Sequence, residues 1–248
     1  MSVRLAGRLA RLVLHLLQGL ATCALVFPWA GVALRERLVR RWSARLLRIC
    51  RVEVGGQQAG HAPLQHALIV SNHISWLDIF VINSLHPCRF VAKAEIRAWP
   101  VVGWLAAQAG TVFIARGNRR DLRHIFQGLV DALGQRQRVA FFPEGTTASQ
   151  GRLLPFHANL FEAAIDAGAA VQPVALAYLD KRGGWHPAVD YVGATTFADS
   201  ILNILGGEPV SARLYCLAPI PAEGAHRREL AQAAHDAIAD ALGVVHAQ

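Results

Sequence analysis

Cysteine and lysine are both scarce in this chain of 248 residues, and several site motifs are missing from it. The four cysteines, Cys23, Cys50, Cys88 and Cys216, show no C-x-x-C spacing, so neither a zinc site nor a disulfide framework is indicated. The histidines share no ligand spacing, so we predict no metal site. A G-x-S-x-G turn is also missing, which argues against a serine hydrolase built on a nucleophile elbow. Reduced thiols in a cytosolic compartment are the simplest interpretation.

Formally charged side chains are missing from Leu12 to Leu34. A helix over this stretch is long enough to cross a hydrocarbon core of about 30 Å, and the excess of arginine after it places the rest of the chain in the cytoplasm. A hairpin interrupted at Pro28, with the arginine-rich segment 35–51 on anionic headgroups, fits equally well. A buried core helix is a third alternative. A cleaved signal peptide fits poorly, because the stretch is too long and ends in arginine.

All but two of the 25 basic residues are arginine, and the formal net charge is +8. The arginines concentrate beside the apolar N-terminus, where each basic side chain contributes about 1 kcal/mol of attraction to an anionic leaflet. No RNA- or DNA-binding signature accompanies them. We therefore predict membrane lipids, and not nucleic acid, as partners.

Strand-like and helical stretches alternate after residue 51. This alternation predicts an α/β layered fold with a mostly parallel sheet flanked by helices, preceded by a helical membrane anchor. Length indicates one catalytic domain, so we divide the chain into an anchoring region, 1–51, and a domain, 52–248. The expected strands are 67–71, 88–92, 111–115, 139–142, 171–177, 189–192 and 213–217, and the expected helices are 76–85, 97–108, 120–135, 158–168 and 226–242.

His73 and Asp78 form the most informative pair. A neutral imidazole takes a proton from an alcohol near pH 7 when a second group fixes its tautomer and stabilises the imidazolium. Positions i and i+5 do not face each other on one regular helix. We therefore expect His73 in the loop after a strand and Asp78 in the first turn of the next helix, with Ser75 as N-cap. On the alternative interpretation, Asp78 only caps a helix and His73 is an ordinary loop histidine.

Further motifs follow in a fixed order. They are K-x-E at Lys93 with Pro100 and Gly103, a strand-like run that ends at Arg116, F-P-E-G-T-T at 142–147, and V-Q-P-V at 171–174. Together with N-H-x4-D at 72–78, this combination resembles the lysophosphatidate acyltransferase family, which esterifies lysolipids. The resemblance runs from about residue 67 to residue 177.

The resemblance implies roles for individual positions. His73 looks like the general base that activates the acceptor hydroxyl, and Asp78 like its orienting partner. The donor would be acyl-CoA or acyl-carrier protein, with no cofactor and no covalent acyl-enzyme. The positions that match substrate-binding parts of the motifs are Asn72, Arg116, Glu144, Gly145, Thr146 and Pro173.

Chemistry alone leaves some of these roles open. Arg116 presents a planar donor fork suited to phosphate. Glu144 does not attract phosphate, so we expect it to hydrogen-bond an acceptor hydroxyl or to pair with an arginine. Gly145 either lets a backbone N–H approach a ligand or simply permits a turn.

The third motif departs from its commoner form, F-P-E-G-T-R, because Thr147 stands at the arginine position. Either Arg116 or Arg152 replaces that charge, or the acceptor lacks a glycerol phosphate. We predict an enzyme of the bacterial inner membrane that acylates 1-acyl-glycerol-3-phosphate to phosphatidate, with lyso-ornithine lipid or another lysolipid as the alternative acceptor. A hydrolase that uses Ser71 or Ser75 is the competing class. A membrane-binding protein without activity is a third.

Overall fold

The computed structural model describes residues 2–55, 61, 64, 66–114 and 119–244, of which 119–125 are described by their backbone alone. Its centre is a seven-stranded sheet in the order β1-β7-β6-β2-β5-β3-β4. The β6–β7 pair is antiparallel and the other five pairs are parallel, which confirms the predicted α/β fold. The strands are β1 (Val52–Gly55), β2 (Leu68–Ser71), β3 (Arg89–Lys93), β4 (Val112–Ile114), β5 (Val139–Phe141), β6 (Val171–Leu179) and β7 (Val210–Cys216).

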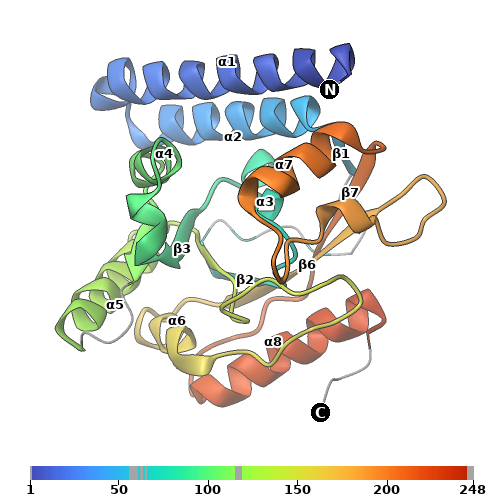
Figure 1. Ribbon diagram of the computed structural model, residues 1–248. Coiled ribbons are helices and arrows are strands. Elements are labelled where there is room, and N and C mark those ends of the chain that lie inside the picture. Colours follow the sequence, from blue (N-terminus) through green and yellow to red (C-terminus); the bar gives the residue numbers. More distant parts are fainter. Residues whose placement is uncertain (1, 56–60, 62–63, 65, 115–118, 245–248) are drawn as a thin grey trace.

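Helices cover both faces of the sheet (Figure 1). One face packs against α2 (Val32–Ile49), α3 (Leu77–Leu85) and α7 (Phe197–Gly206), and the other against α5 (Arg119–Gly134), α6 (Glu162–Asp166) and α8 (Arg227–Leu242). Strand β2 contributes to both cores, because Ile69 faces the first set of helices while Leu68 and Val70 face the second. A strand buried on both faces is apolar along its whole length, which is why this run was recognisable in the sequence.

The N-terminal segment forms a helical hairpin. Helix α1 (Val3–Leu25) leads through η1 (Phe27–Trp29), which contains Pro28, into α2, and the two helices lie side by side in Figure 1. The Trp42 indole N–H donates to the His15 carbonyl oxygen at 3.2 Å, and the His15 Nε2 lies 3.0 Å from the Trp42 carbonyl oxygen. Among the described helices, α1 is long and apolar enough to cross a membrane, by length and composition.

Several predicted elements differ from those observed. The predicted helix 97–108 is divided into η2 (Ala94–Ala98) and α4 (Val102–Gln108), because Pro100 lacks an N–H and Val101 adopts φ +65°. The predicted strand 189–192 is wrong, since the chain forms η4 (Pro187–Val189) there and then a loop. The predicted helix 158–168 is η3 (Ala158–Phe161) followed by the short α6. The sequence analysis missed β1 and α7.

Gly103, which the sequence spacing singled out, lies where two backbone segments meet. A Cβ at this position would lie 2.3 Å from the Arg97 carbonyl oxygen and 2.5 Å from that of Ile96. Backbone cannot move aside as a flexible side chain can, so we expect Gly103→Ala to lower the free energy of unfolding by about 1–3 kcal/mol. Denaturant unfolding of the two proteins measures this difference. Gly128→Ala, at a helical glycine whose added Cβ has no atom within 4 Å, is the matched control.

Candidate active site

His73 lies in the loop after β2, and its side chain meets that of Asp78 in the first turn of α3, as predicted. The His73 Nδ1 lies 2.8 Å from the Asp78 Oδ2, and the Asp78 side chain is fully buried. The same oxygen accepts hydrogen bonds from the backbone N–H groups of Ile74, at 2.7 Å, and Ser75, at 3.0 Å. A carboxylate does not donate, so Nδ1 of the neutral ring carries the proton and Nε2 carries the lone pair. This tautomer is the one that a general base requires.

The expected role of Ser75 as the N-cap is wrong. Helix α3 begins at Leu77 after Trp76, which makes no side-chain capping bond. The Ser75 Oγ is buried without a hydrogen-bond partner, and so is the Ser71 Oγ. The Asp78 carboxylate instead reaches back to the Ser75 N–H, which is the reciprocal half of a capping box. Asp78 therefore stabilises the loop and orients the histidine at once.

The third motif holds His73 from the other side. The Phe142 ring stacks on the His73 ring with centroids 3.9 Å apart and planes within 8°. The His73 carbonyl oxygen accepts a hydrogen bond from the Ala148 N–H at 2.8 Å. Both contacts come from the segment after β5, which lies next to β2 in the sheet. Adjacent parallel strands thus bring together two motifs that are some 70 residues apart in the sequence.

Glu144 is buried, and both of its carboxylate oxygens accept backbone hydrogen bonds. The His73 N–H donates to Oε1 at 2.7 Å, and the Leu154 N–H donates to Oε2 at 2.9 Å. These bonds join the His73 loop to the segment after the third motif. Burial raises the pKa of the Glu144 carboxyl to about 7, while the two backbone hydrogen bonds oppose that rise. The role of Glu144 in binding the acceptor stays a prediction.

This raised pKa makes stability depend on pH. The pKa of Glu144 in the folded chain is above its ordinary value of 4.5. The contribution of Glu144 to the free energy of unfolding is therefore complete below pH 4.5, and it is lost as the pH rises through about 7. One pKa unit corresponds to about 1.4 kcal/mol, so the unfolding free energy of the wild type should fall by up to a few kcal/mol relative to Glu144→Gln over this interval. Chemical denaturation at several pH values measures it. Parallel pH profiles for the two proteins would contradict the prediction.

The other expected substrate-binding residues lie in different settings. The buried Asn72 side chain exchanges two hydrogen bonds with the Leu176 backbone, at 2.9 and 2.8 Å, and so joins the end of β2 to β6. Pro173 is buried in β6 opposite Val70. Thr146 is exposed next to the His73 loop. Arg116 lies outside the described residues.

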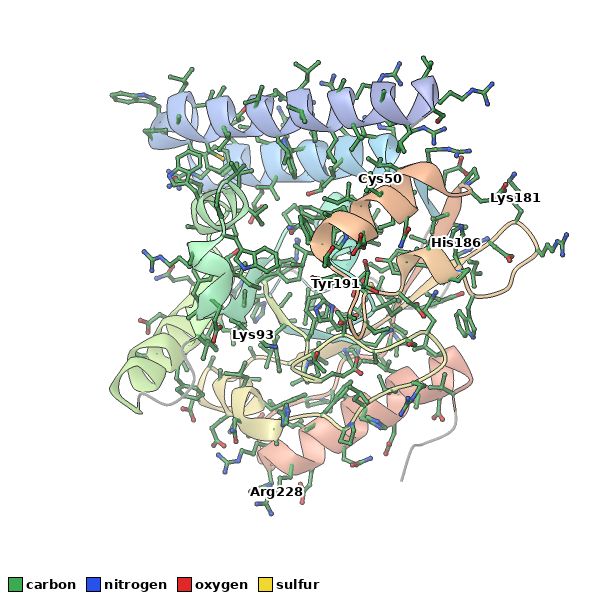
Figure 2. All side chains as sticks on the ribbon, in the orientation of Figure 1. Cys50, Lys93, Lys181, His186, Tyr191 and Arg228 are labelled. Carbon is green, nitrogen blue, oxygen red and sulfur yellow. The ribbon has the colours of Figure 1, made fainter. Side chains whose placement is uncertain are left out.

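Gly145 adopts φ +68° and donates its N–H to the Phe142 carbonyl oxygen at 3.1 Å. Its amide therefore closes a turn, as the plainer of the two interpretations expected. Thr147, at the position where the commoner motif has arginine, donates its hydroxyl to the Tyr191 carbonyl oxygen. Tyr191 is half-buried, and its label lies near the middle of the view in Figure 2. The third motif thus ends in a neutral, internally bonded side chain.

An apolar cavity of about 300 Å³ opens beside His73. Its walls come from the N-terminal hairpin, α3, α4, β3 and α7, and Thr147 and Tyr191 line it together with His73. The sequence did not reveal this space, because its lining is spread from residue 12 to residue 201. Among the bulky side chains that enclose it are Leu16, Trp42, Phe80, Phe90, Leu105 and Phe197.

Tyr178 is a site residue that the sequence analysis missed. Its hydroxyl donates to the Asp78 Oδ1 at 2.6 Å, and its side chain is fully buried. The two residues are 100 positions apart, so no short motif connects them. The one available signal was a tyrosine within an apolar strand, since a buried phenol requires a polar partner.

This chain resembles a protein family, individual sequences and a solved structure. A family model described as "Acyltransferase" matches residues 51–177. A lyso-ornithine lipid O-acyltransferase from Pseudomonas aeruginosa is 42% identical over 97% of this chain and 94% of its own length. A 1-acyl-sn-glycerol-3-phosphate acyltransferase from Neisseria meningitidis is 47% identical over 52% of this chain and 51% of its own length. The crystal structure of the 1-acyl-sn-glycerophosphate acyltransferase from Thermotoga maritima has the same fold, with a TM-score of 0.61 and 18% identity over 97% of this chain and 100% of that one.

Proposed function

We propose that this chain, which belongs to the acyltransferase family, transfers a fatty acyl group from an acyl thioester to the free hydroxyl of a lysolipid. The observation that carries the proposal is the His73–Asp78 pair at the wall of an apolar cavity. A base beside an apolar space suits a reaction in which both substrates carry hydrocarbon chains.

The geometry supports a direct transfer. The acceptor hydroxyl gives its proton to the His73 Nε2 as its oxygen attacks the thioester carbonyl carbon, and Asp78 stabilises the imidazolium. The carbon–oxygen bond forms, the carbon–sulfur bond breaks, and the proton passes from His73 to the leaving thiolate. The hydroxyls of Ser71 and Ser75 are buried without partners, so neither is bonded to the base that a serine hydrolase would need.

We place the acyl chain of the donor in the apolar cavity. The cavity is lined by His73 and by side chains of the N-terminal hairpin, α3, α4 and α7. A thioester carbonyl held beside His73 would leave the hydrocarbon chain surrounded by apolar side chains, away from water. Either acyl-CoA or acyl-carrier protein satisfies this arrangement, because both present the chain on the same thioester.

For the acceptor we favour lyso-ornithine lipid. The Pseudomonas relative with that activity in its name aligns along almost the entire chain. Thr147 also places a neutral hydroxyl, already donated to the Tyr191 backbone, where the commoner motif has a phosphate-binding arginine. The second candidate is 1-acyl-glycerol-3-phosphate, which the sequence analysis ranked first. It is favoured by the higher identity of the Neisseria relative over the shared 131 residues.

We further propose that the N-terminal hairpin, the region 1–51, attaches the domain to a cytoplasmic membrane leaflet. Its outer surface exposes large apolar side chains, with Leu14 65%, Leu25 73% and Trp29 89% exposed. Arginines flank this surface in the sequence, as expected for a helix pair that lies on anionic headgroups. The cavity adjoins this hairpin, so a lipid substrate would have a short path from the bilayer.

An acceptor assay tests the proposed reaction and the proposed acceptor. Purified protein in mixed micelles receives palmitoyl-CoA with lyso-ornithine lipid, with 1-acyl-glycerol-3-phosphate, or with neither. We expect CoA release to depend on a lysolipid and to be faster with lyso-ornithine lipid. Preference for the phosphate acceptor, together with rescue of a strain that lacks phosphatidate synthesis, would favour the second candidate. Free fatty acid released without any acceptor would indicate a hydrolase instead.

A further inference from the structure

The carboxylate of Asp78 receives hydrogen bonds at both oxygens. Oδ2 accepts from the ring of His73 and from two backbone N–H groups, and Oδ1 accepts from the Tyr178 hydroxyl at 2.6 Å. The backbone donors, Ile74 and Ser75, belong to the loop just before the helix that carries Asp78, whereas Tyr178 belongs to β6, next to β2 in the sheet. The Tyr178 contact therefore ties the carboxylate to the sheet itself.

The Tyr178 side chain has little freedom to leave this position. It is 0% exposed, and both of its backbone groups make hydrogen bonds. The Tyr178 N–H donates to the Gln150 Oε1 at 2.7 Å, and its carbonyl oxygen accepts from the His186 N–H at 2.9 Å. Burial and the neighbouring Asp78 charge raise the pKa of the phenol well above its ordinary value, so the hydroxyl remains a donor throughout the working pH range.

We propose that Tyr178 is a positioning residue, which acts on His73 through Asp78 during acyl transfer. This role rests on the proposed function. Its hydrogen bond fixes the rotation of the carboxylate, so that Oδ2 faces the imidazole. The same bond draws negative charge from the carboxylate and so limits how strongly Asp78 stabilises the imidazolium. Tyr178 thus acts on both the orientation of the base and the charge that faces it.

The first test is Tyr178→Phe, assayed with palmitoyl-CoA and lysolipid across pH. Without the phenol, the carboxylate is less well oriented, and we expect kcat on the plateau to fall about tenfold, the value of one hydrogen bond to a charged group. The carboxylate also keeps more of its charge, which stabilises the imidazolium. The acid limb of kcat/KM should therefore move up by about half a pH unit or more.

Tyr215→Phe is the matched control. Tyr215 lies on the adjacent strand β7 and packs with Leu153 and Ile238 on the opposite face of the sheet. Loss of its hydroxyl is the same chemical change, and we expect neither the plateau nor the acid limb to move. A lower plateau with an unmoved limb in Tyr178→Phe would mean that the residue acts only through packing, and would overturn the proposal.

A second substitution keeps the test independent of folding. With 3-fluorotyrosine at position 178 the ring and the hydrogen bond remain, but the hydroxyl becomes a stronger donor. We expect the acid limb to move down, opposite to the phenylalanine variant. An unmoved limb in this protein would overturn the proposal even if Tyr178→Phe failed to fold.

A double-mutant comparison separates the role of Tyr178 from the proposed function. If Tyr178 acts through Asp78, its replacement should change kcat far less in an Asp78→Asn background than in the wild type. Equal effects in both backgrounds would overturn the role of Tyr178 and leave the proposed function intact. A wild-type protein that transfers no acyl group to either lysolipid would overturn the proposed function, and this role with it.

Discussion

Replacing His73 with alanine is expected to lower acyl transfer by about 10³-fold, within the range that general base catalysis contributes. The variant loses the group that accepts the proton of the acceptor hydroxyl, and the described structure offers no second base bonded to Asp78 in its place. Association with lipid vesicles should be unchanged, because the exposed apolar side chains of the hairpin are untouched. Thioester consumption and vesicle sedimentation measure the two properties on the same preparation.

His157→Ala is the matched control for this prediction. His157 follows the third motif in the sequence, but its side chain is exposed and makes no capping bond to η3. Its loss should leave the transfer rate within about twofold of the wild type, as usual for a surface substitution. Activity retained by His73→Ala would remove His73 from the mechanism, and loss of vesicle binding would show that the variant had changed more than the base.

The contact between His73 and Asp78 was predictable because it is local. The two residues are five positions apart, and the need for a loop followed by a helix start limits their geometry to a narrow range. The parallel sheet was predictable for a related reason, because strands such as β2 are buried on both faces and read as continuous apolar runs.

The features that the sequence did not reveal are short elements and contacts between residues that are far apart in the sequence. Strand β1 is a four-residue edge strand that pairs only with β7 among the described strands, so its apolar pattern is too short to distinguish from a loop. The predicted strand 189–192 was misleading because its apolar residues, Val189, Tyr191 and Val192, lie in a 3₁₀ helix and the loop after it, and of these three only Val189 is buried. The Tyr178–Asp78 bond and the cavity arise only when β6 and the hairpin come into place.

Glu144 shows how a motif can be recognised while the contacts of its side chain are not. The sequence suggested a carboxylate directed at an acceptor hydroxyl or an arginine. In the structure its two oxygens accept the N–H groups of His73 and Leu154. Backbone donors leave no trace in a sequence, because every residue except proline carries one. This contact was therefore beyond prediction, although the position was not.

Replacing Asp78 with asparagine is the second substitution for which we expect a large effect. The amide oxygen can take the place of Oδ2 and accept from the backbone N–H groups of Ile74 and Ser75 and from the His73 ring. The amide NH₂ then faces the Tyr178 hydroxyl, which can accept as well as donate. The fold and the tautomer should persist. What is lost is the negative charge beside the imidazolium.

That charge is worth about 4 kcal/mol for two unit charges 4 Å apart at an effective dielectric constant of about 20, so we expect kcat to fall about 10³-fold. Asp199→Asn makes the same change in the first turn of α7, where the carboxylate is exposed, and should leave kcat nearly unchanged. A loss below about tenfold in Asp78→Asn would show that the carboxylate only orients the ring.

The direction of the pH shift distinguishes charge from orientation more sharply than the rate does. Without the Asp78 charge the imidazolium is less stable, so the acid limb of kcat/KM should move to lower pH in Asp78→Asn. Without the Tyr178 hydroxyl the same charge acts more strongly, and the limb should move to higher pH. Removing the carboxylate and removing its phenol donor are thus expected to shift the same acid limb in opposite directions. A general loosening of the site would lower both rates without separating the limbs.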